Sequence, residues 1–174
     1  MAKEVRINIQ YYDSPCGRLF LASFADKLCL CDWSDNHFAE RNKRRLERYL
    51  KASFKTETTP VLEETKRQLD DFFAGKRKAF DIQIRLVGTD FQQQVWNALL
   101  SIPYGATKSY KEIAQCIGKP KAVRAVAGAI GANGISILIP CHRVIGSNRS
   151  LTGYAGGLVA KRMLLGMETT EHKC

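Results

Sequence analysis

The residue best suited to chemistry in this chain is Cys141, which follows Pro140 and precedes His142 and Arg143. Only the thiolate form of cysteine is a strong nucleophile, and a neighbouring imidazole or cation favours that form. Proline fixes its own φ and lacks an N–H, so it presents the next residue in a defined direction. The motif therefore predicts a cysteine held for attack on an electrophile.

A carboxylate that could complete the site is Glu168, near the end of a helix predicted over 158–167. In a Cys-His-Glu triad the carboxylate orients the histidine, and the histidine activates the thiol. Chain order alone does not bring the three groups together. The competing interpretation makes Glu168 a solvated residue close to the chain end.

The charge of the chain points to a polyanionic partner. Residues 86–174 hold 10 Lys or Arg against 4 Asp or Glu, whereas residues 1–85 hold 17 against 13. A basic surface with so few acids suits nucleic acid. The plainer alternative is a basic protein whose charge serves solubility alone.

A helix predicted to start at Pro120 has an unusual outer face. At 100° per residue its core side contains five apolar residues, Ala122, Val123, Val126, Ala127 and Ile130. The opposite side holds two cations and three small residues, which are Lys121, Arg124, Ala125, Gly128 and Ala132. Such a face lets the backbone approach a DNA groove, and the lack of base-reading Asn or Gln favours contacts to shape and backbone, in the minor groove. Packing against another helix is the alternative, but it would bury Arg124 without a partner.

The first half of the chain, residues 1–87, has the pattern of an α/β domain. Short β-prone runs are expected at 5–12, 19–24 and 28–33, with hairpin turns between them, and 80–85 alternates like a last strand. One charged helix is expected over 39–51, and a second from the Thr59 cap and Pro60 to Gly75.

The second half, residues 88–174, is predicted to be a helical, winged helix-turn-helix domain. Thr89 with Gln92 and Ser109 with Glu112 form capping boxes that open two helices. The tight turn at Gly118 before the Pro120 helix is typical of a helix-turn-helix. The apolar run 135–139 and residues 143–145 are expected to form the wing around the cysteine, and the glycine-rich stretch 146–157 a binding loop.

Composition excludes several other classes of protein. No stretch approaches the length of a membrane span, and the N-terminus lacks the apolar core of a signal peptide, so a reducing, cytoplasmic location is expected. The six cysteines have no disulfide spacing. A zinc site from Cys16, Cys29, Cys31 and His37 is conceivable, but the i, i+2 spacing in a strand favours two buried thiols, and we predict no metal and no cofactor.

Several ordered motifs in residues 89–168 resemble the catalytic domain of the O6-alkylguanine-DNA alkyltransferases, also called methylated-DNA–protein-cysteine methyltransferases. These motifs are Pro140–Val144, Ser109-Tyr110, Arg124–Val126, Asn133, Thr152–Gly157, and Lys161 to Glu168. Residues 13–17 more weakly resemble the first hairpin of the family, whose N-terminal domain is ribonuclease-H-like. The resemblance implies an α+β protein with that N-terminal domain before the DNA-binding, alkyl-accepting one.

The resemblance also implies a role for each site residue. Cys141 takes the alkyl group in a single, irreversible turnover, and His142 accepts its proton while Glu168 orients the imidazole. Asn133 braces the turn before the cysteine. The substrate pocket is implied to comprise Tyr110, Val144, Tyr154, Ala155 and Lys161. Arg124 is implied to replace the extruded guanine in the stack, with Lys121, Ala125 and Gly128 on the same DNA-binding face.

The implied activity is direct repair of O6-alkylguanine, and potentially O4-alkylthymine, in double-stranded DNA by a monomer. The main alternative is a non-enzymatic lesion-binding protein, such as the alkyltransferase-like proteins that lack the reactive cysteine. A DNA-binding regulator would not need Cys141 and His142 beside a glycine-tyrosine pocket, and a cysteine hydrolase would need an oxyanion helix that the motif does not provide.

Two residues depart from the family pattern. Gly134 stands directly after Asn133, where the family usually has proline. Glycine is expected to loosen the turn before the cysteine. Arg149 stands at a turn position where glycine is usual, and because arginine disfavours φ > 0 we expect a reshaped turn and an extra cation near a phosphate. Both changes are predicted to alter rate or stability without abolishing transfer.

Overall fold

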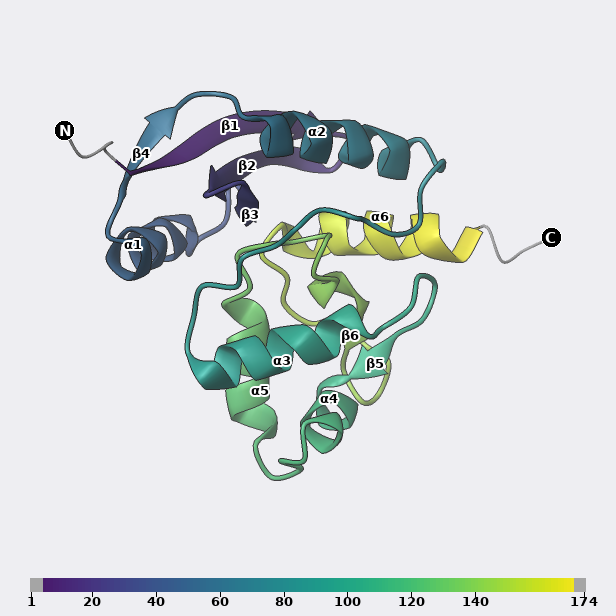
Figure 1. The fold of residues 1–174 in the computed structure, drawn as a ribbon. Helices are drawn as coiled ribbons and strands as arrows, with labels where there is room; N and C mark the ends of the chain where they lie inside the picture. The colour runs from purple at the N-terminus through teal and green to yellow at the C-terminus, as the bar shows by residue number, and fades with distance from the viewer. Residues whose placement is uncertain (1–4, 171–174) are drawn as a thin grey trace. The chain divides into compact units, whose positions relative to one another are not determined.

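The computed structural model describes residues 5–170, except for the side chain of Thr170. The chain divides into two compact units between Gly88 and Thr89. The first unit combines a sheet with helices, and the second is mainly helical (Figure 1). The fold is therefore α+β, as the sequence predicts.

The first unit is built on a four-stranded sheet in the order β3-β2-β1-β4. Its strands are β1 (Arg6–Ser14), β2 (Gly17–Phe24), β3 (Lys27–Trp33) and β4 (Ser53–Thr56). The first three strands are antiparallel neighbours, whereas β4 runs parallel to β1. The turn from β2 to β3 places Ala25 at φ 49° and Asp26 at φ 64°, as the right-handed twist of a tight hairpin favours.

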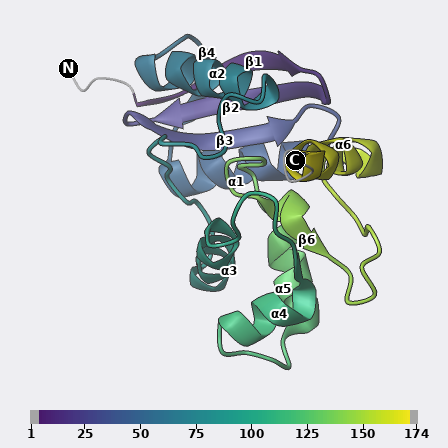
Figure 2. The ribbon, with the colours of Figure 1, turned by 90° about the vertical axis from the view of Figure 1, so that its right-hand side faces the viewer.

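Helices cover both faces of this sheet (Figures 1 and 2). On one face Leu46 of α1 (Ala39–Leu50) joins a buried cluster that includes Ile7 and Phe20. On the other face lies α2 (Pro60–Phe73). Its capping Thr59 hydroxyl is 2.9 Å from the Ser23 hydroxyl. Residues on both faces of the strands are thus buried under helices. This explains why the strands are continuously apolar, whereas a sheet with one face in solvent would alternate apolar and polar residues.

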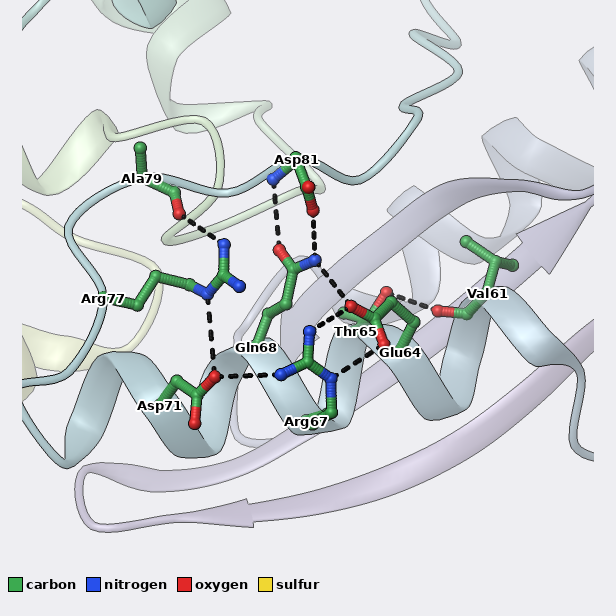
Figure 3. Close-up of polar contacts among 9 residues, drawn as sticks. All are labelled: Val61, Glu64, Thr65, Arg67, Gln68, Asp71, Arg77, Ala79 and Asp81. Atoms are coloured by element: carbon green, nitrogen blue, oxygen red, sulfur yellow. Dashed lines mark hydrogen bonds and ion pairs between the residues drawn. The ribbon is translucent and has the colours of Figure 1, made fainter.

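Polar contacts join α2 to the chain that follows it (Figure 3). The Gln68 side-chain amide bonds Asp81 twice, because its Oε1 accepts from the Asp81 N–H at 3.1 Å and its Nε2 donates to the Asp81 carboxylate. Arg67 pairs with both Glu64 and Asp71 on the same helix. Buried Gln68 therefore holds Asp81 against α2, just before the segment 82–85 that contacts the edge of β3.

The expected last strand over 80–85 is wrong. The segment keeps the alternating exposure that its sequence predicts, but it forms only an isolated bridge between Ile84 and Leu28. Leu28 donates to the Gln83 carbonyl at 2.9 Å and accepts from the Arg85 N–H at 2.8 Å. The alternation therefore reflects one contact with the edge of β3. The fourth strand of the sheet is instead β4, which has only four residues and so shows no clear alternating pattern in the sequence.

The second unit is built from helices with short strands between them. These elements are α3 (Asp90–Leu100), β5 (Lys108–Ser109), α4 (Tyr110–Cys116), α5 (Val123–Gly131), the 3-10 turn η1 (Cys141–Arg143), β6 (Val144–Ile145) and α6 (Gly157–Thr170). Both predicted capping boxes are present at Thr89 and Ser109. Trp96 of α3 donates to the Ala129 carbonyl of α5 at 2.8 Å, which fixes these two helices against each other.

The helix-turn-helix is formed by α4 and α5, but two details differ from the sequence prediction. The second helix starts at Val123 rather than Pro120, since the Ala122 N–H bonds the Lys119 carbonyl in a separate turn first. Ala132 is buried rather than outward-facing. It follows the last turn of α5 as its C-cap, where its N–H bonds the Gly128 carbonyl.

The expected wing, formed by residues 135–139 and 143–145, is also wrong, because these two segments do not pair with each other as strands. Residues 135–139 form no strand but a buried turn in which Ile137 has φ 72°. Instead, β6 pairs in parallel with β5, with Ser109 opposite Ile145. The glycine-rich loop after β6, residues 146–156 (the pocket loop), is thereby tied to the start of α4 (Figure 1).

Candidate active site

The turn that leads to the cysteine is closed by Asn133, whose side chain is buried. Its Oδ1 accepts from the Ile135 N–H at 3.0 Å, and its Nδ2 donates to the Ile139 carbonyl at 3.1 Å. One amide side chain therefore holds both ends of the apolar run. This geometry matches the bracing position predicted for Asn133, although Asn133 does not contact the catalytic groups in any recorded hydrogen bond.

Cys141 and His142 lie together in η1 and are both buried, with 6% and 0% of their surfaces exposed. The Cys141 N–H donates to the Ile139 carbonyl at 2.7 Å, so the Asn133 turn continues directly into the predicted nucleophile. The ring of Tyr154 meets the His142 ring edge-on at 6.5 Å between centroids. Cys141 and His142 thus lie in the interior of the second unit rather than on an open surface.

Glu168 completes the predicted triad from α6. Its Oε1 is 2.8 Å from His142 Nε2, and the residue is fully buried. The interpretation of Glu168 as a solvated end residue is therefore wrong. Burial of a carboxylate is costly unless hydrogen bonds and opposite charge compensate for it.

That compensation comes from Arg143, a partner that the sequence analysis missed. Arg143 Nε donates to both Glu168 oxygens at 3.1 and 3.0 Å, and Nη2 donates to Oε1 at 2.8 Å. Arg143 Nη1 also donates to the Ile102 carbonyl at 2.7 Å. The available signal was that Arg143 continues an apolar, buried run, because a buried guanidinium requires a carboxylate partner.

The electrostatics of this group favour a neutral imidazole. Burial lowers the pKa of His142, and the neighbouring Glu168 opposes that shift only in part. Burial alone would raise the pKa of Glu168, but the bonds and charges of His142 and Arg143 outweigh it and lower the pKa. An ionised carboxylate only accepts hydrogen bonds, so a neutral His142 must carry its proton on Nε2.

The other imidazole nitrogen is consequently a proton acceptor. His142 Nδ1 is buried and has no hydrogen-bond partner within residues 5–170. It has a free lone pair when Nε2–H faces Glu168. The arrangement supplies a base next in sequence to the thiol, as general-base activation of a cysteine requires.

Lys161 connects the cysteine segment to the pocket loop. Its Nζ donates to the Val144 carbonyl at 2.6 Å and to the Thr152 carbonyl at 2.8 Å, and the residue is buried. Burial lowers the pKa of Lys161, while attraction to a Cys141 thiolate opposes this shift. The Val144 carbonyl predicted to receive a substrate amine retains its second lone pair.

The remaining predicted pocket residues are only partly buried. Tyr110 opens α4, and its phenolic oxygen accepts from the Thr152 hydroxyl at 3.0 Å. Its own O–H proton remains available to a substrate. Tyr154 and Ala155 follow in the same loop, and both are half-buried. Thr152 was not predicted as a side-chain partner, and nothing in its local sequence indicated that role.

The predicted DNA-binding face is exposed in the second unit. Arg124, Ala125 and Gly128 lie on the outer side of α5, and Lys121 precedes the helix. A Cβ added at Gly128 would meet no atom within 4 Å. No helix in the described part of this unit covers these exposed residues, so the alternative of a buried helix contact is wrong here.

The part of the chain that the structure describes holds neither a metal-binding cluster nor a membrane-spanning helix. Within residues 5–170 no three His, Cys, Asp or Glu side chains gather so as to hold a metal ion. Cys29 and Cys31 are buried in β3. In the same range no helix is both long and apolar enough to cross a membrane.

Comparison with known proteins places this geometry in a family. Residues 90–170 match the family model described as 6-O-methylguanine DNA methyltransferase, DNA binding domain, and residues 7–86 match its ribonuclease-like domain. A methylated-DNA–protein-cysteine methyltransferase of Methanosarcina barkeri is 47% identical over 91% of this chain and 96% of its own length. The constitutive enzyme of that name from Bacillus subtilis is 41% identical over 95% and 99%. The chain belongs to the methylated-DNA–protein-cysteine methyltransferase family.

Solved structures of family members have the same fold. The Mycobacterium tuberculosis OGT in complex with DNA has a TM-score of 0.79 and 41% identity, covering 95% of this chain and 94% of its own. An enzyme from Pyrococcus kodakaraensis has a TM-score of 0.61 at 18% identity, which supports the fold alone.

Arg149 of this methyltransferase adopts the left-handed conformation that glycine favours, with φ 64°. Its N–H donates to the Gly146 carbonyl at 2.8 Å, and the Gly146 N–H donates to the Ser150 carbonyl at 2.9 Å. Neighbouring hydrogen bonds therefore hold the arginine in a conformation that glycine adopts more easily.

Proposed function

We propose that the protein repairs DNA by direct reversal, moving an alkyl group from O6 of guanine in a duplex to the Cys141 sulfur. The observation that carries the proposal is the buried His142–Glu168–Arg143 group, which leaves a basic imidazole nitrogen next to the cysteine. Family membership supports the same chemistry. The solved DNA complex of the M. tuberculosis relative supports DNA as the partner.

The first step is recognition of the duplex by α5. The exposed small residues Ala125 and Gly128 admit the DNA backbone, and Arg124 fills the space of the extruded nucleotide. Extrusion costs a few kcal/mol, and less when the base is damaged and poorly paired. The arginine lowers that cost further because its guanidinium plane stacks on neighbouring bases.

The second step holds the base beside the sulfur. The Tyr110 hydroxyl, which accepts from Thr152, donates its own proton toward the ring nitrogen N3. The Val144 carbonyl accepts from the exocyclic amine with its second lone pair, and Tyr154 and Ala155 line the pocket near O6. Lys161 keeps Val144 and the loop in register.

The third step is the transfer itself. His142 Nδ1 takes the thiol proton, directly or through a water, and Glu168 stabilises the resulting imidazolium. A bond forms between sulfur and the alkyl carbon while the bond from that carbon to O6 breaks. The guanine gains the proton that the thiol lost. Because the product thioether is inert, each molecule reacts once.

The location that suits this chemistry is a reducing cytoplasm. The described cysteines are free thiols, and Cys141 must stay reduced to accept carbon. We expect a monomer to act on double-stranded DNA there.

Mass measurement distinguishes transfer from mere lesion binding. The full-length protein is incubated with a duplex containing O6-methylguanine, and its mass and the peptide bearing Cys141 are then determined. The expected result is one added methyl group per molecule, in place of the thiol proton, on Cys141. Cys116→Ser is the matched control, because Cys116 is an exposed thiol on α4 and should not affect transfer.

Two outcomes would contradict the proposal. Tight binding to the lesion with no mass gain in the parent protein would favour the lesion-binding alternative. Retention of the full mass gain in Cys141→Ser would place the acceptor elsewhere.

A further inference from the structure

The turn between β6 and the pocket loop carries a cation in an unfavourable conformation. Arg149 has φ 64° and is exposed at the tip of this turn. Side chains with a Cβ disfavour this region, whereas glycine enters it freely. An arginine therefore persists at a position where a smaller residue would fold more easily.

The turn does not offer the arginine an alternative conformation. Its N–H bonds the Gly146 carbonyl, and the Ser150 N–H donates to Asn148 Oδ1 at 3.1 Å. A Cβ at Gly146 would lie 2.8 Å from the Ser150 hydroxyl, so the turn is tight as well as closed. These neighbours fix the backbone, and the side chain at position 149 projects from a rigid support.

The described part of the chain provides no counter-charge for this guanidinium. Arg149 makes no recorded side-chain hydrogen bond or ion pair in the part of the chain that the structure describes. Residues 113–167 contain seven Lys or Arg and no Asp or Glu. The exposed cations in that stretch are Lys119, Lys121, Arg124, Arg149 and Arg162. The exposed Arg149 guanidinium is therefore available to an anion that a ligand supplies.

The position of the turn identifies that ligand. It follows β6, which pairs with β5 directly before Tyr110. It also precedes Thr152 by two residues, and the Thr152 hydroxyl bonds the Tyr110 hydroxyl at 3.0 Å. Arg149 is thus anchored at both ends to the segments that carry the base pocket. A nucleotide that enters this pocket brings its own phosphates, so the anion expected there is the DNA backbone.

We propose that Arg149 binds a backbone phosphate of the strand that carries the extruded nucleotide. The inference rests on the proposed function, since it requires DNA at this pocket. It assigns to this chain a phosphate contact that a glycine at the same turn position cannot make. Because a phosphate is common to every sequence, the contact strengthens binding to any duplex, damaged or not.

The test uses affinity for an unmodified duplex, which separates this contact from alkyl transfer. Fluorescence anisotropy gives Kd for the full-length parent and for Arg149→Gly over about 0.05 to 0.3 M salt. Loss of one phosphate contact is expected to weaken binding about five- to tenfold at about 0.1 M salt and to reduce the salt slope by about 0.9. Arg149→Lys keeps the charge and should retain most of the affinity and most of the salt slope.

Lys51→Gly is the matched control. Lys51 is also an exposed cation at positive φ, with φ 49°, but it caps α1 in the first unit. Both glycine variants should raise the midpoint of thermal unfolding, because both relieve the same backbone strain. Only Arg149→Gly should lose affinity and salt slope.

The proposal is overturned if Arg149→Gly binds the duplex as tightly as Lys51→Gly with the same salt slope. A parent protein that binds no duplex at any salt concentration would instead overturn the proposed function. Mass transfer to Cys141 from the methylated duplex reports on that function separately.

Discussion

Arg143 and Glu168 form a buried ion pair in which three guanidinium-to-carboxylate contacts lie between 2.8 and 3.1 Å. The same carboxylate receives His142 Nε2 at 2.8 Å. Glu168 therefore has two tasks, since it neutralises a buried cation and orients an imidazole. The pair joins α6 to η1, so the geometry of the cysteine site depends on a contact between residues 25 positions apart.

Glu168→Gln is expected to destabilise the protein as well as slow the transfer. The variant leaves Arg143 buried without a counter-charge, which costs about 3 to 5 kcal/mol in the free energy of unfolding. Urea unfolding measures this loss. Glu57→Gln is the control, because Glu57 pairs with Lys55 at the surface, and exposed pairs contribute about 0 to 1 kcal/mol. A loss in Glu168→Gln no larger than in this control would contradict the role of the pair.

The pH profile of transfer separates orientation from simple stability. Glu168 raises the pKa of His142 against the effect of burial, so its neutralisation should lower that pKa further. The acid limb of the rate profile then moves to lower pH in Glu168→Gln. The plateau rate falls as well, because a less basic imidazole is a weaker proton acceptor. An unchanged acid limb would argue that His142 is not the base.

Stability is expected to fall on acidification. The folded protein holds the pKa of His142 below its ordinary 6.5, so the unfolded chain binds more protons between these two values. The free energy of unfolding therefore decreases as the pH falls below 6.5 and through the folded-state pKa. Glu168, whose pKa is lowered from 4.5, adds a loss of the same sign at lower pH.

Chemical unfolding between pH 7.5 and 5, a range set by the ordinary histidine pKa of about 6.5, measures the first part of this loss. His142→Asn should show a shallower decrease than the parent, because it lacks the titrating group. His37→Gln, at an exposed position of the first unit, serves as the control. An equally steep decrease in His142→Asn would assign the loss to other groups.

Lys161→Met should slow transfer and loosen the pocket loop. The methionine keeps similar length but leaves the Val144 and Thr152 carbonyls without their donor. A hydrogen bond from a charged group contributes about 1.5 to 3 kcal/mol, so a rate decrease of tenfold or more is expected if the transition state needs the intact loop. Single-turnover kinetics measures the rate, and amide hydrogen exchange over 146–156 measures the loosening.

Arg162→Met provides the comparison for this variant. This substitution removes the exposed guanidinium of Arg162, which follows Lys161 on α6. Its transfer rate and loop exchange should match those of the parent. Equal effects of the two substitutions would attribute the loss to general charge rather than to the buried contacts of Lys161.

Gly134→Pro should stabilise the turn that leads to Cys141. Gly134 does not have positive φ, and no hydrogen bond from its N–H is recorded to any residue that the structure describes. Proline therefore restricts the unfolded chain without removing a known contact, which stabilises by about 0.4 to 1 kcal/mol. Thermal unfolding and single-turnover rates test this, and we expect transfer to persist. A lower melting temperature would show that the ring collides with the Asn133 turn.

Local chemistry determined much of this protein from sequence alone. The capping boxes at Thr89 and Ser109 and the turn at Gly17 depend on residues within a few positions, so their sequence is sufficient. The same holds for the order of proline, cysteine and histidine, and for the small outer face of α5. These features predicted the fold class, the family and the reactive residue.

Tertiary structure decided the contacts between distant segments. The alternation of residues 80–85 could not reveal that β3 offers them only one bridge, because strand pairing depends on the partner edge. Residues 135–139 are β-prone, yet the Asn133 side chain closes them into a turn. The partner of Arg143 was equally hidden, since a buried charge reveals that it needs a carboxylate but not which one. Only the folded chain selects Glu168, because burial and distance are properties of the assembled core.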